Sequence, residues 1–303
     1  MFKEPHQIRN IFIPLLVFLF FSFLNPPAQS QESQEPTQQI DEFSLAGYEE
    51  KGKKSWDISG KSADILENTV KLKDVESNLY GDSEDIKLTA EKGDFDKKEG
   101  KIHLEQDVVI TTSTGARLTT DSLDWDKKNR LVTTEDVVNI TRDNMVTVAS
   151  GAKGEPNLNK VTLEKDVKVD IHSSKEVPKD IATKNEITIT CDGPLEIDYG
   201  RNIAIFKNNV LVDTEGMQIN SDLMNIYFLS TDKSAAQPNE PGAIMGTRID
   251  KIIAQGNVKI VRGENVSYSD EATYTATNKK ITLSGKPRLV IYSTEDLNAS
   301  FRN

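Results

Sequence analysis

The sequence predicts an all-β protein made of short antiparallel strands stacked side by side. From Phe43 onward, Ile, Val, Thr and Leu alternate with charged residues over short stretches, which is the period of half-buried strands. A short acidic or amide residue also stands directly before Val six times, and self-similarity of this kind indicates a repeated structural unit. The six pairs are Asp74/Val75, Asp107/Val108, Asp136/Val137, Asp166/Val167, Asn209/Val210 and Asn257/Val258.

Each predicted unit has the same order of elements. A turn containing Gly or Asn comes first, as at 98–100, because these residues tolerate positive φ. A strand with alternate apolar residues follows, such as Ile102 and Leu104. Two polar residues and the Asp/Asn–Val pair then predict a β-bulge or corner at which the strand bends. A strand led by Gly closes the unit, as at 115–121 and 216–222.

Two polar segments that contain proline interrupt this rhythm. The segment at 173–186 is interpreted as a domain junction, and the segment at 230–241 as a hairpin loop or a disordered insertion. The predicted β-domains are therefore 43–178 and 179–303. Residues 31–42 are rich in Pro, Gln, Ser and Glu, and this composition predicts a disordered tether.

The N-terminal residues 1–30 differ from the rest of the chain. Lys3 and Arg9 precede an apolar run at 11–24, which has the length of a secretory h-region and is short for ~30 Å of hydrocarbon. Small residues fit cleavage after Ser30. The run is a signal peptide or a retained membrane anchor, and either one delivers the remaining chain across the membrane.

The composition excludes several classes of function. The formal net charge of −11 repels phosphate groups, so we expect no nucleic-acid partner. The single cysteine, Cys191, excludes an internal disulfide framework and a Cys-based zinc site. It is interpreted as a small buried strand residue rather than as a reactive thiol.

No constellation of residues predicts catalysis or a cofactor. His6, His103 and His172 are far apart in sequence, whereas a metal site or a catalytic triad needs clustered partners. The Asp/Asn–Val pairs are interpreted as turns rather than calcium ligands, because Val offers no side-chain oxygen. We therefore expect no cofactor, no metal and no enzymatic activity. A β-helical carbohydrate-active enzyme is the remaining catalytic alternative.

The alternation of the strands predicts an apolar inner face. This face is either a filled sandwich core or a groove left open for alkyl chains, in which each buried methylene contributes ~0.8 kcal/mol. The predicted groove-lining, lipid-binding residues are Ile86, Leu88, Ile102, Leu104, Val108, Ile110, Leu118, Ile203, Ile205, Val210, Val212, Ile219, Val258, Ile260, Ile281 and Leu283.

Two regions of the chain resemble lipopolysaccharide-export proteins. Residues 43–169 resemble LptC, and residues 187–290 are similar to LptA or OstA-type domains. For LptC, the matching segments are Gly52, 56–60, 70–75, 86–93 and 100–110. For the LptA or OstA type, they are 254–260, 272–274 and 281–287.

This resemblance implies an all-β, OstA-like tandem β-jellyroll, with an N-terminal apolar signal or anchor segment. It implies a periplasmic bridge component whose V-shaped interior carries lipopolysaccharide acyl chains toward the outer membrane, attached to the inner membrane if the N-terminal segment is retained. The implied partners are lipopolysaccharide, inner-membrane ABC transporter components and other OstA-like jellyrolls. Edge strands around Val70 and Leu289 are expected to pair with those chains. The alternative is a structural or adhesive cell-envelope β-repeat protein without lipid cargo.

Overall fold

Strands make up all the regular structure that the computed structural model describes. The described residues are 38–48, 52–81, 85–126, 128–129, 131–155, 160–172, 186–229, 243–244 and 247–291. Pro36–Asn303 form one unit, and the other unit, Met1–Glu35, lies outside the described residues. The predicted signal or anchor segment is therefore not described, and most of the two predicted breaks is not described either. No helix in the described ranges has the length and apolar character to cross a bilayer.

Eighteen strands follow one another along the described chain, which confirms the all-β prediction. They are β1 (Gln38–Tyr48), β2 (Lys54–Ile65), β3 (Thr69–Tyr80), β4 (Asp85–Asp96), β5 (Lys101–Thr112), β6 (Arg117–Asp126), β7 (Leu131–Arg142), β8 (Met145–Glu155), β9 (Lys160–His172), β10 (Glu186–Cys191), β11 (Leu195–Asp198), β12 (Ile203–Thr214), β13 (Met217–Phe228), β14 (Ala243–Ile244), β15 (Thr247–Arg262), β16 (Asn265–Thr275), β17 (Lys280–Ser284) and β18 (Arg288–Val290). Because β1 begins at Gln38, residues 38–42 belong to a strand and not to the predicted disordered tether.

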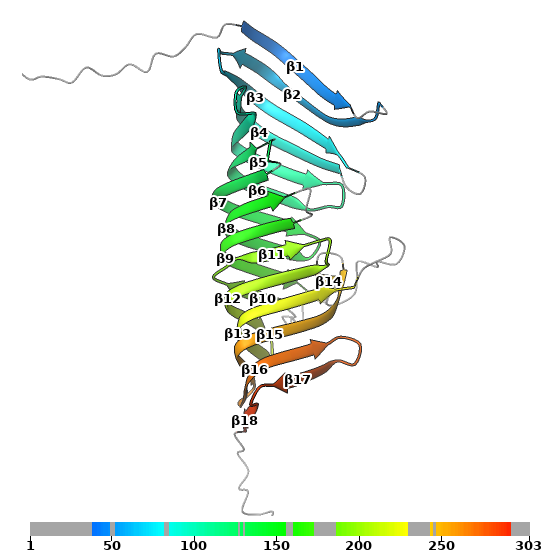
Figure 1. The fold of residues 1–303 in the computed structure, drawn as a ribbon, viewed down its shortest axis with the longest axis vertical. Coiled ribbons are helices and arrows are strands. Elements are labelled where there is room, and N and C mark those ends of the chain that lie inside the picture. The colour runs from blue at the N-terminus through cyan, green and yellow to red at the C-terminus, as the bar shows by residue number, and fades with distance from the viewer. Residues whose placement is uncertain are drawn as a thin grey trace, which may run out of the picture. The chain divides into compact units, whose positions relative to one another are not determined.

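The strands form an antiparallel meander, in which almost every strand pairs with the next one in sequence. Figure 1 shows them stacked in chain order from β1 to β18. Two places in the stack hold a divided strand. The short strands β10 and β11 both lie between β9 and β12, and β17 and β18 both pair with β16. The stack is therefore continuous from β9 to β12, across the segment at 173–185.

Most long strands bend at a β-bulge in their middle, where the sequence predicted a corner. The pairing of β5 with β6 slips between Glu105 and Val108, and the pairing of β12 with β13 slips between Lys207 and Val210. Five of the six predicted Asp or Asn residues have the left-handed φ that such a bulge needs, and Asn and Asp tolerate this φ better than most side chains. They are Asp74, Asp107, Asp166, Asn209 and Asn257, with φ between 47 and 51°.

The remaining pair, Asp136/Val137, does not follow this pattern. Val137 is 52% exposed, whereas the next residue, Val138, is fully buried. The β7–β8 register still shifts between Thr134 and Val137, and the backbone N–H of Asp136 donates to the hydroxyl of Thr134. The bulge is therefore present, but Val138 takes the buried position that the sequence analysis gave to Val137.

A buried valine packs beside a small residue of the next strand at each corner. The short partner side chain leaves room for the strand to bend without a clash between neighbouring strands. The buried pairs are Val75 with Ala90, Val108 with Thr120, Val138 with Ala149, Val167 with Cys191, Val210 with Ser221 and Val258 with Ser269. This placement confirms that Cys191 is a small buried strand residue, and burial raises the pKa of its thiol.

The buried core consists of two clusters. One cluster takes residues from β1 to β6, and the other takes residues from β7 to β16. Between them, the buried hydroxyls of Thr120 on β6 and Thr134 on β7 hydrogen-bond to each other at 3.3 Å. The second cluster contains both Ile171 on β9 and Ile189 on β10. The two predicted domains thus share this core, while their predicted boundary at 178/179 lies outside the described residues.

The two ends of the described stack are edge strands. At one end, β1 pairs with β2 alone, so the predicted edge around Val70 is wrong: Val70 lies in β3, which is paired on both sides. At the other end, Leu289 lies in β18, which pairs with β16 alone, and its side chain is largely exposed. The predicted edge around Leu289 is therefore confirmed for the described strands.

The left-handed backbone at Asp107 generates a stability prediction. Replacing Asp107 with Val should lower the free energy of unfolding by ~1–2 kcal/mol, because a β-branched side chain clashes at a φ of 50°. Asp107→Gly should cost little, since Gly adopts this φ freely. Urea unfolding followed by circular dichroism measures both changes.

Asp121 provides the matched control for this comparison. It is exposed on β6, and its φ is not positive. Asp121→Val should change the unfolding free energy by less than ~0.5 kcal/mol. Equal unfolding midpoints for Asp107→Val and Asp121→Val would refute the role assigned to the bulge.

Candidate functional site

An unfilled cavity lies between the inner faces of the strands from β9 to β17, and we call it the C-terminal cavity. Its volume is about 330 Å³, and only Thr214 and Tyr274 among its lining residues carry a polar side-chain group. The lining residues are Ile171, Ile187, Ile189, Val212, Thr214, Met217, Ile219, Met224, Ile226, Ile249, Ile252, Ala254, Ile260, Ala272, Tyr274 and Ile281.

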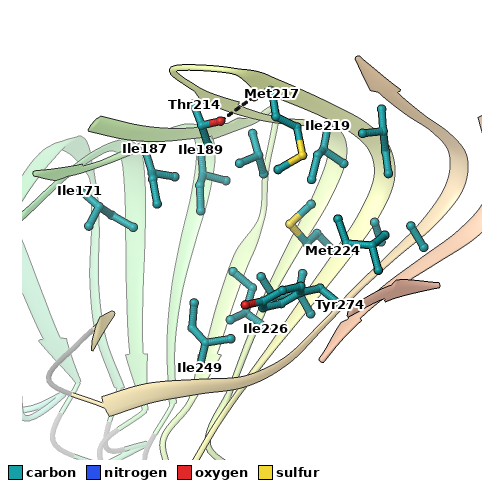
Figure 2. Close-up of a pocket in the computed structure, with 16 residues that line it drawn as sticks. Ile171, Ile187, Ile189, Thr214, Met217, Ile219, Met224, Ile226, Ile249 and Tyr274 are labelled. Carbon is teal, nitrogen blue, oxygen red and sulfur yellow. Dashed lines mark hydrogen bonds between the residues drawn. The ribbon is translucent and has the colours of Figure 1, made fainter. Parts of the chain in front are cut away.

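The C-terminal cavity separates two walls of side chains. Figure 2 shows one row, which includes Ile189 and Ile219, pointing across the gap toward a second row with Ile226 and Tyr274. Neighbours within a wall are cross-strand partners, because Ile219 lies opposite Ile260 and Ile226 lies opposite Ile252. Met224 lies between the two rows in Figure 2. The two walls and the bend that joins them form the predicted jellyroll.

A second cavity of about 420 Å³ lies between strands β4 and β13, and we call it the central cavity. One wall comes from β4 to β9, and the facing wall comes from β9 and β11 to β13. Its lining residues are Ile86, Ile110, Thr112, Ala116, Arg117, Leu118, Ile140, Arg142, Met145, Thr147, Val161, Leu163, Val169, Leu195, Ile197, Tyr199, Ala204, Phe206, Ile226 and Phe228.

Both cavities belong to one groove on the inner side of the sheet. Ile226 on β13 lines the central cavity and also the C-terminal cavity, so the two spaces are neighbours along the inner face. Each volume lies in the ~300–1,000 Å³ range of small-molecule sites. Most of the residues that line both cavities are apolar, and the groove is therefore suited to bind hydrocarbon chains by burial.

The β-bulges explain why both walls are apolar. In β12, Phe206 and Val210 are both buried and lie four positions apart, the even spacing of one strand face. The bulge at Asn208 and Asn209 sets these two residues opposite a single residue of β13, between the pairs Lys207–Leu223 and Val210–Ser221. The inward face thus remains apolar as the strand crosses from one wall to the other. After the bulge, Val212 continues this face and lines the C-terminal cavity.

Comparison with known proteins agrees with this architecture. The family model for LptC-related lipopolysaccharide-assembly proteins matches residues 11–172, more than half of the chain. The chain belongs to this LptC-related family. The model for the LptA/LptD N-terminal domain, a lipopolysaccharide transport protein family, matches residues 188–300. A search of curated proteins finds no significant match. The order of the two matches confirms the predicted resemblance and assigns the chain a role in lipopolysaccharide transport.

The central cavity is built by both matched regions together. Its first wall, from Ile86 to Val169, lies in the LptC-related region. Much of the facing wall, from Leu195 to Phe228, lies in the LptA-type region. In this chain, the groove therefore crosses from one family region to the other within a single sheet.

The predicted groove residues fall into three groups in the structure. Seven of them line a cavity: Ile86, Ile110 and Leu118 in the central cavity, and Val212, Ile219, Ile260 and Ile281 in the C-terminal cavity. Seven others pack in or against the core clusters without lining either cavity: Leu88, Ile102, Leu104, Val108, Val210, Val258 and Leu283. The last two are Ile203 and Ile205.

Ile203 and Ile205 lie on the opposite face of β12 from the groove. Ala204 and Phe206 are buried and line the central cavity, whereas the two isoleucines alternate with them and are only half-buried. This corrects the predicted orientation of the strand. Four apolar residues in a row fit either face, and the bulge that follows them fixes which face points inward.

Several groove residues were missed by the sequence analysis. Phe206, Met224 and Ile226 are examples, and each is buried beside a cavity. Two signals point to them: spacing of two along a strand, and spacing of four across the bulge, as between Phe206 and Val210. Arg142 follows Ile140 at the same spacing of two, but its charge argued against an apolar inner face, and Arg117 carried no such signal.

The candidates for catalytic chemistry lie apart from the groove. His103 on β5 hydrogen-bonds through Nδ1 to Asp124 on the neighbouring strand at 2.7 Å, at an exposed position. His172 lies on a different strand, β9, and is exposed. Among the described residues, no group of three or more His, Cys, Asp or Glu side chains is placed to hold a metal ion.

A polar cluster on β2 and β3 lowers the pKa of a carboxylate. Asp57 accepts hydrogen bonds from Asn78 and Tyr80, each at 2.8 Å, and pairs with Lys54 at 2.5 Å. The ammonium of Lys54 and these two hydrogen bonds lower the pKa of Asp57 to about 2. The cluster ties the second strand to the third near the β1 end of the stack.

The unfilled volume generates a packing prediction. Ile219 lines the C-terminal cavity, so the larger side chain in Ile219→Phe can extend into open space, and the unfolding free energy should fall by less than ~1 kcal/mol. Val210 is 1% exposed and lines neither cavity, so Val210→Phe should cost ~1–3 kcal/mol by overpacking. Urea unfolding measures both. Equal losses at the two sites would mean that the interior is filled.

Proposed function

We propose that this chain is a periplasmic bridge component that holds lipopolysaccharide acyl chains in its groove. It passes them from an inner-membrane ABC transporter toward the outer membrane. The observation that carries the proposal is the apolar groove between two walls that do not close on each other. A role in lipopolysaccharide transport follows from the family, and the groove supplies a physical means for it.

Burial of hydrocarbon supports this assignment. Each methylene group that enters the groove contributes ~0.8 kcal/mol, so long chains bind without a polar clasp. The walls present branched aliphatic and thioether side chains, such as Ile189, Ile219 and Met217, which pack against alkyl chains and impose little directional preference. A groove of this kind lets a chain slide along its length, which suits transfer better than permanent storage.

The edge strands support end-to-end assembly with other chains. β1 is exposed along almost its whole length, and Leu289 in β18 is exposed at the opposite end of the described stack. An unpaired edge recruits another strand by β-augmentation. We infer that β1 pairs with a transporter component, and that β17 and β18 pair with another OstA-like jellyroll.

The groove also separates this function from its alternatives. A structural or adhesive β-repeat protein needs a filled interior for stability, and unfilled apolar volume costs it free energy. A carbohydrate-active enzyme needs a pair of carboxylates facing its substrate. The lining of the two cavities includes no Asp or Glu. We therefore infer a non-catalytic lipid carrier.

Photo-crosslinking in cells tests the groove. Benzoyl-phenylalanine at Ile110 or Ile260 should capture lipopolysaccharide, because both residues line a cavity. Benzoyl-phenylalanine at Ile205, on the outer face of β12, or at His103 should capture much less. Immunoblotting for lipopolysaccharide on the purified adduct measures the capture. Capture at Ile205 and His103 with none at Ile110 or Ile260 would refute the groove.

Proline substitutions test the edge pairing. Successive N–H groups point to opposite edges of a strand, so Ser44→Pro and Leu45→Pro in β1 remove donors on opposite sides. One of the two should abolish co-purification with the transporter while leaving the β1–β2 pairing intact. Leu289→Pro should likewise weaken co-purification with a second jellyroll chain.

Threonine substitutions at the same positions serve as controls. Leu45→Thr and Leu289→Thr remove the apolar side chain but keep the backbone N–H, so partner recovery should stay close to that of the unmodified chain. Undiminished recovery of both partners in all three proline variants would contradict pairing through these edges.

A further inference from the structure

The two cavities differ in the charge of their walls. The C-terminal cavity has no charged residue in its lining, whereas Arg117 and Arg142 line the central cavity. No Asp or Glu accompanies them in that lining. This is notable in a chain with 48 acidic and 37 basic residues, in which a basic wall runs against the overall balance.

Arg142 lies at the end of an otherwise apolar inner face. It follows Val138 and Ile140 in the alternation of β7, so its side chain continues the row that faces the groove. Only 22% of the side chain is exposed, and its Nε is buried without a hydrogen-bond partner. Asp143 forms an ion pair with Arg142 at 3.9 Å from Nε, which is too long for a hydrogen bond, and the Asp143 carboxylate is itself about half exposed.

Arg117 lies on the neighbouring strand, close in register to Arg142. It begins β6, where it pairs with Thr141 of β7, the residue directly before Arg142. Arg117 is exposed, and it borders the central cavity next to Ala116 and Leu118. Cross-strand partners share a face, so Arg117 lies on the face of Thr141 and only borders the cavity at the end of the strand, whereas Arg142 lies on the inner face with Ile140.

We propose that Arg142 binds the anionic oxygens of a lipid headgroup whose alkyl chain occupies the central cavity. The headgroup is a phosphate or carboxylate, the groups that a guanidinium recognises with two parallel hydrogen bonds. This inference rests on the proposed function, since it assigns a headgroup subsite to the same groove.

The surroundings of Arg142 favour this ligand. A donor that is buried without a partner regains a hydrogen bond when an anionic oxygen approaches it. The apolar wall next to it lowers the local dielectric, which strengthens attraction to an anion relative to an exposed arginine. A neutral amphiphile would bury the same chain but leave Nε unpaired, so the site should select anionic lipids among those that fit the groove.

Labelling with two photoactivatable probes tests the proposal. The full chain is placed in phosphatidylcholine nanodiscs and exposed to dodecyl phosphate or to dodecanol, each with a diazirine near the end of the chain. Mass spectrometry then measures the labelled fraction of peptides that line the central cavity. Dodecyl phosphate should half-saturate at a concentration ~10-fold lower than dodecanol, the size expected for one charge-assisted hydrogen bond.

Substitutions assign the preference to the arginine. Arg142→Gln should remove the ~10-fold advantage of the phosphate and change dodecanol labelling by less than about twofold. Arg142→Lys keeps the charge and should retain part of the advantage. Arg262→Gln is the matched control, because Arg262 is exposed on β15 and lines neither cavity. It should behave like the unmodified chain.

Two further arms separate a lipid headgroup from a free anion. Inorganic phosphate at the same concentration should not displace dodecyl phosphate, because it buries no chain. Raising the salt from about 0.05 to about 0.5 M should weaken labelling by the phosphate probe and leave dodecanol unchanged. Displacement by inorganic phosphate as effective as by unlabelled dodecyl phosphate would overturn the lipid assignment.

The outcomes separate this inference from the proposed function. Labelling of the cavity by neither probe would contradict the lipid groove itself. Equal labelling by both probes, or an equal loss of both in Arg142→Gln, would leave the groove standing and overturn the headgroup subsite. A folding defect in Arg142→Gln would show in circular dichroism, and Arg142→Lys, which keeps the positive charge, would then decide between the two explanations.

Discussion

The bend in each strand is the constraint on which the rest of this structure depends. An extended sheet would present one flat apolar face, and a fully closed one would fill its own interior. Here, a residue with left-handed backbone such as Asn257 lets the strand turn, and the buried valine that follows it packs beside a small partner, as Val258 does with Ser269. Repeated along the stack, this corner holds the two walls apart and leaves the space between them unfilled.

The repeated strand pairing also joins the two family regions into one sheet, with no subunit interface between them. β9, at the end of the LptC-related match, pairs directly with β10 and β11, which begin the LptA-type region. Bridges made of separate chains must hold each junction by an edge-to-edge contact that can dissociate. In this molecule, the two regions are covalently linked and share a hydrophobic core that includes Ile171 and Ile189. The wall of the central cavity therefore does not depend on subunit concentration.

Much of this could be predicted from the sequence, because β-alternation and the Asp/Asn–Val pairs are local signals. The errors arose where local signals were ambiguous. Ile203 and Ile205 belong to a run of four apolar residues, so alternation alone does not say which face of the strand is buried. Val137 and Val138 are adjacent valines, and the sequence alone does not say which of them is buried at the bulge. Residues 38–42, the first part of β1, were assigned to the tether because their polar sequence resembles one. Arg142 follows the alternation of Val138 and Ile140, but its charge gave no reason to expect it on an apolar inner face, and only the folded structure places it beside the central cavity.

The meander of antiparallel strands also determines how the reach of such a molecule can change. Adjacent strands lie ~4.8 Å apart, and a strand cannot be added alone without reversing the direction in which the chain leaves the stack. Strands are therefore gained or lost in pairs, as hairpins, and each pair changes the length of the stack by ~10 Å. The length of such a stack therefore changes in discrete steps, and the divided strand β10 and β11 shows that an irregular step is accommodated without interrupting the sheet.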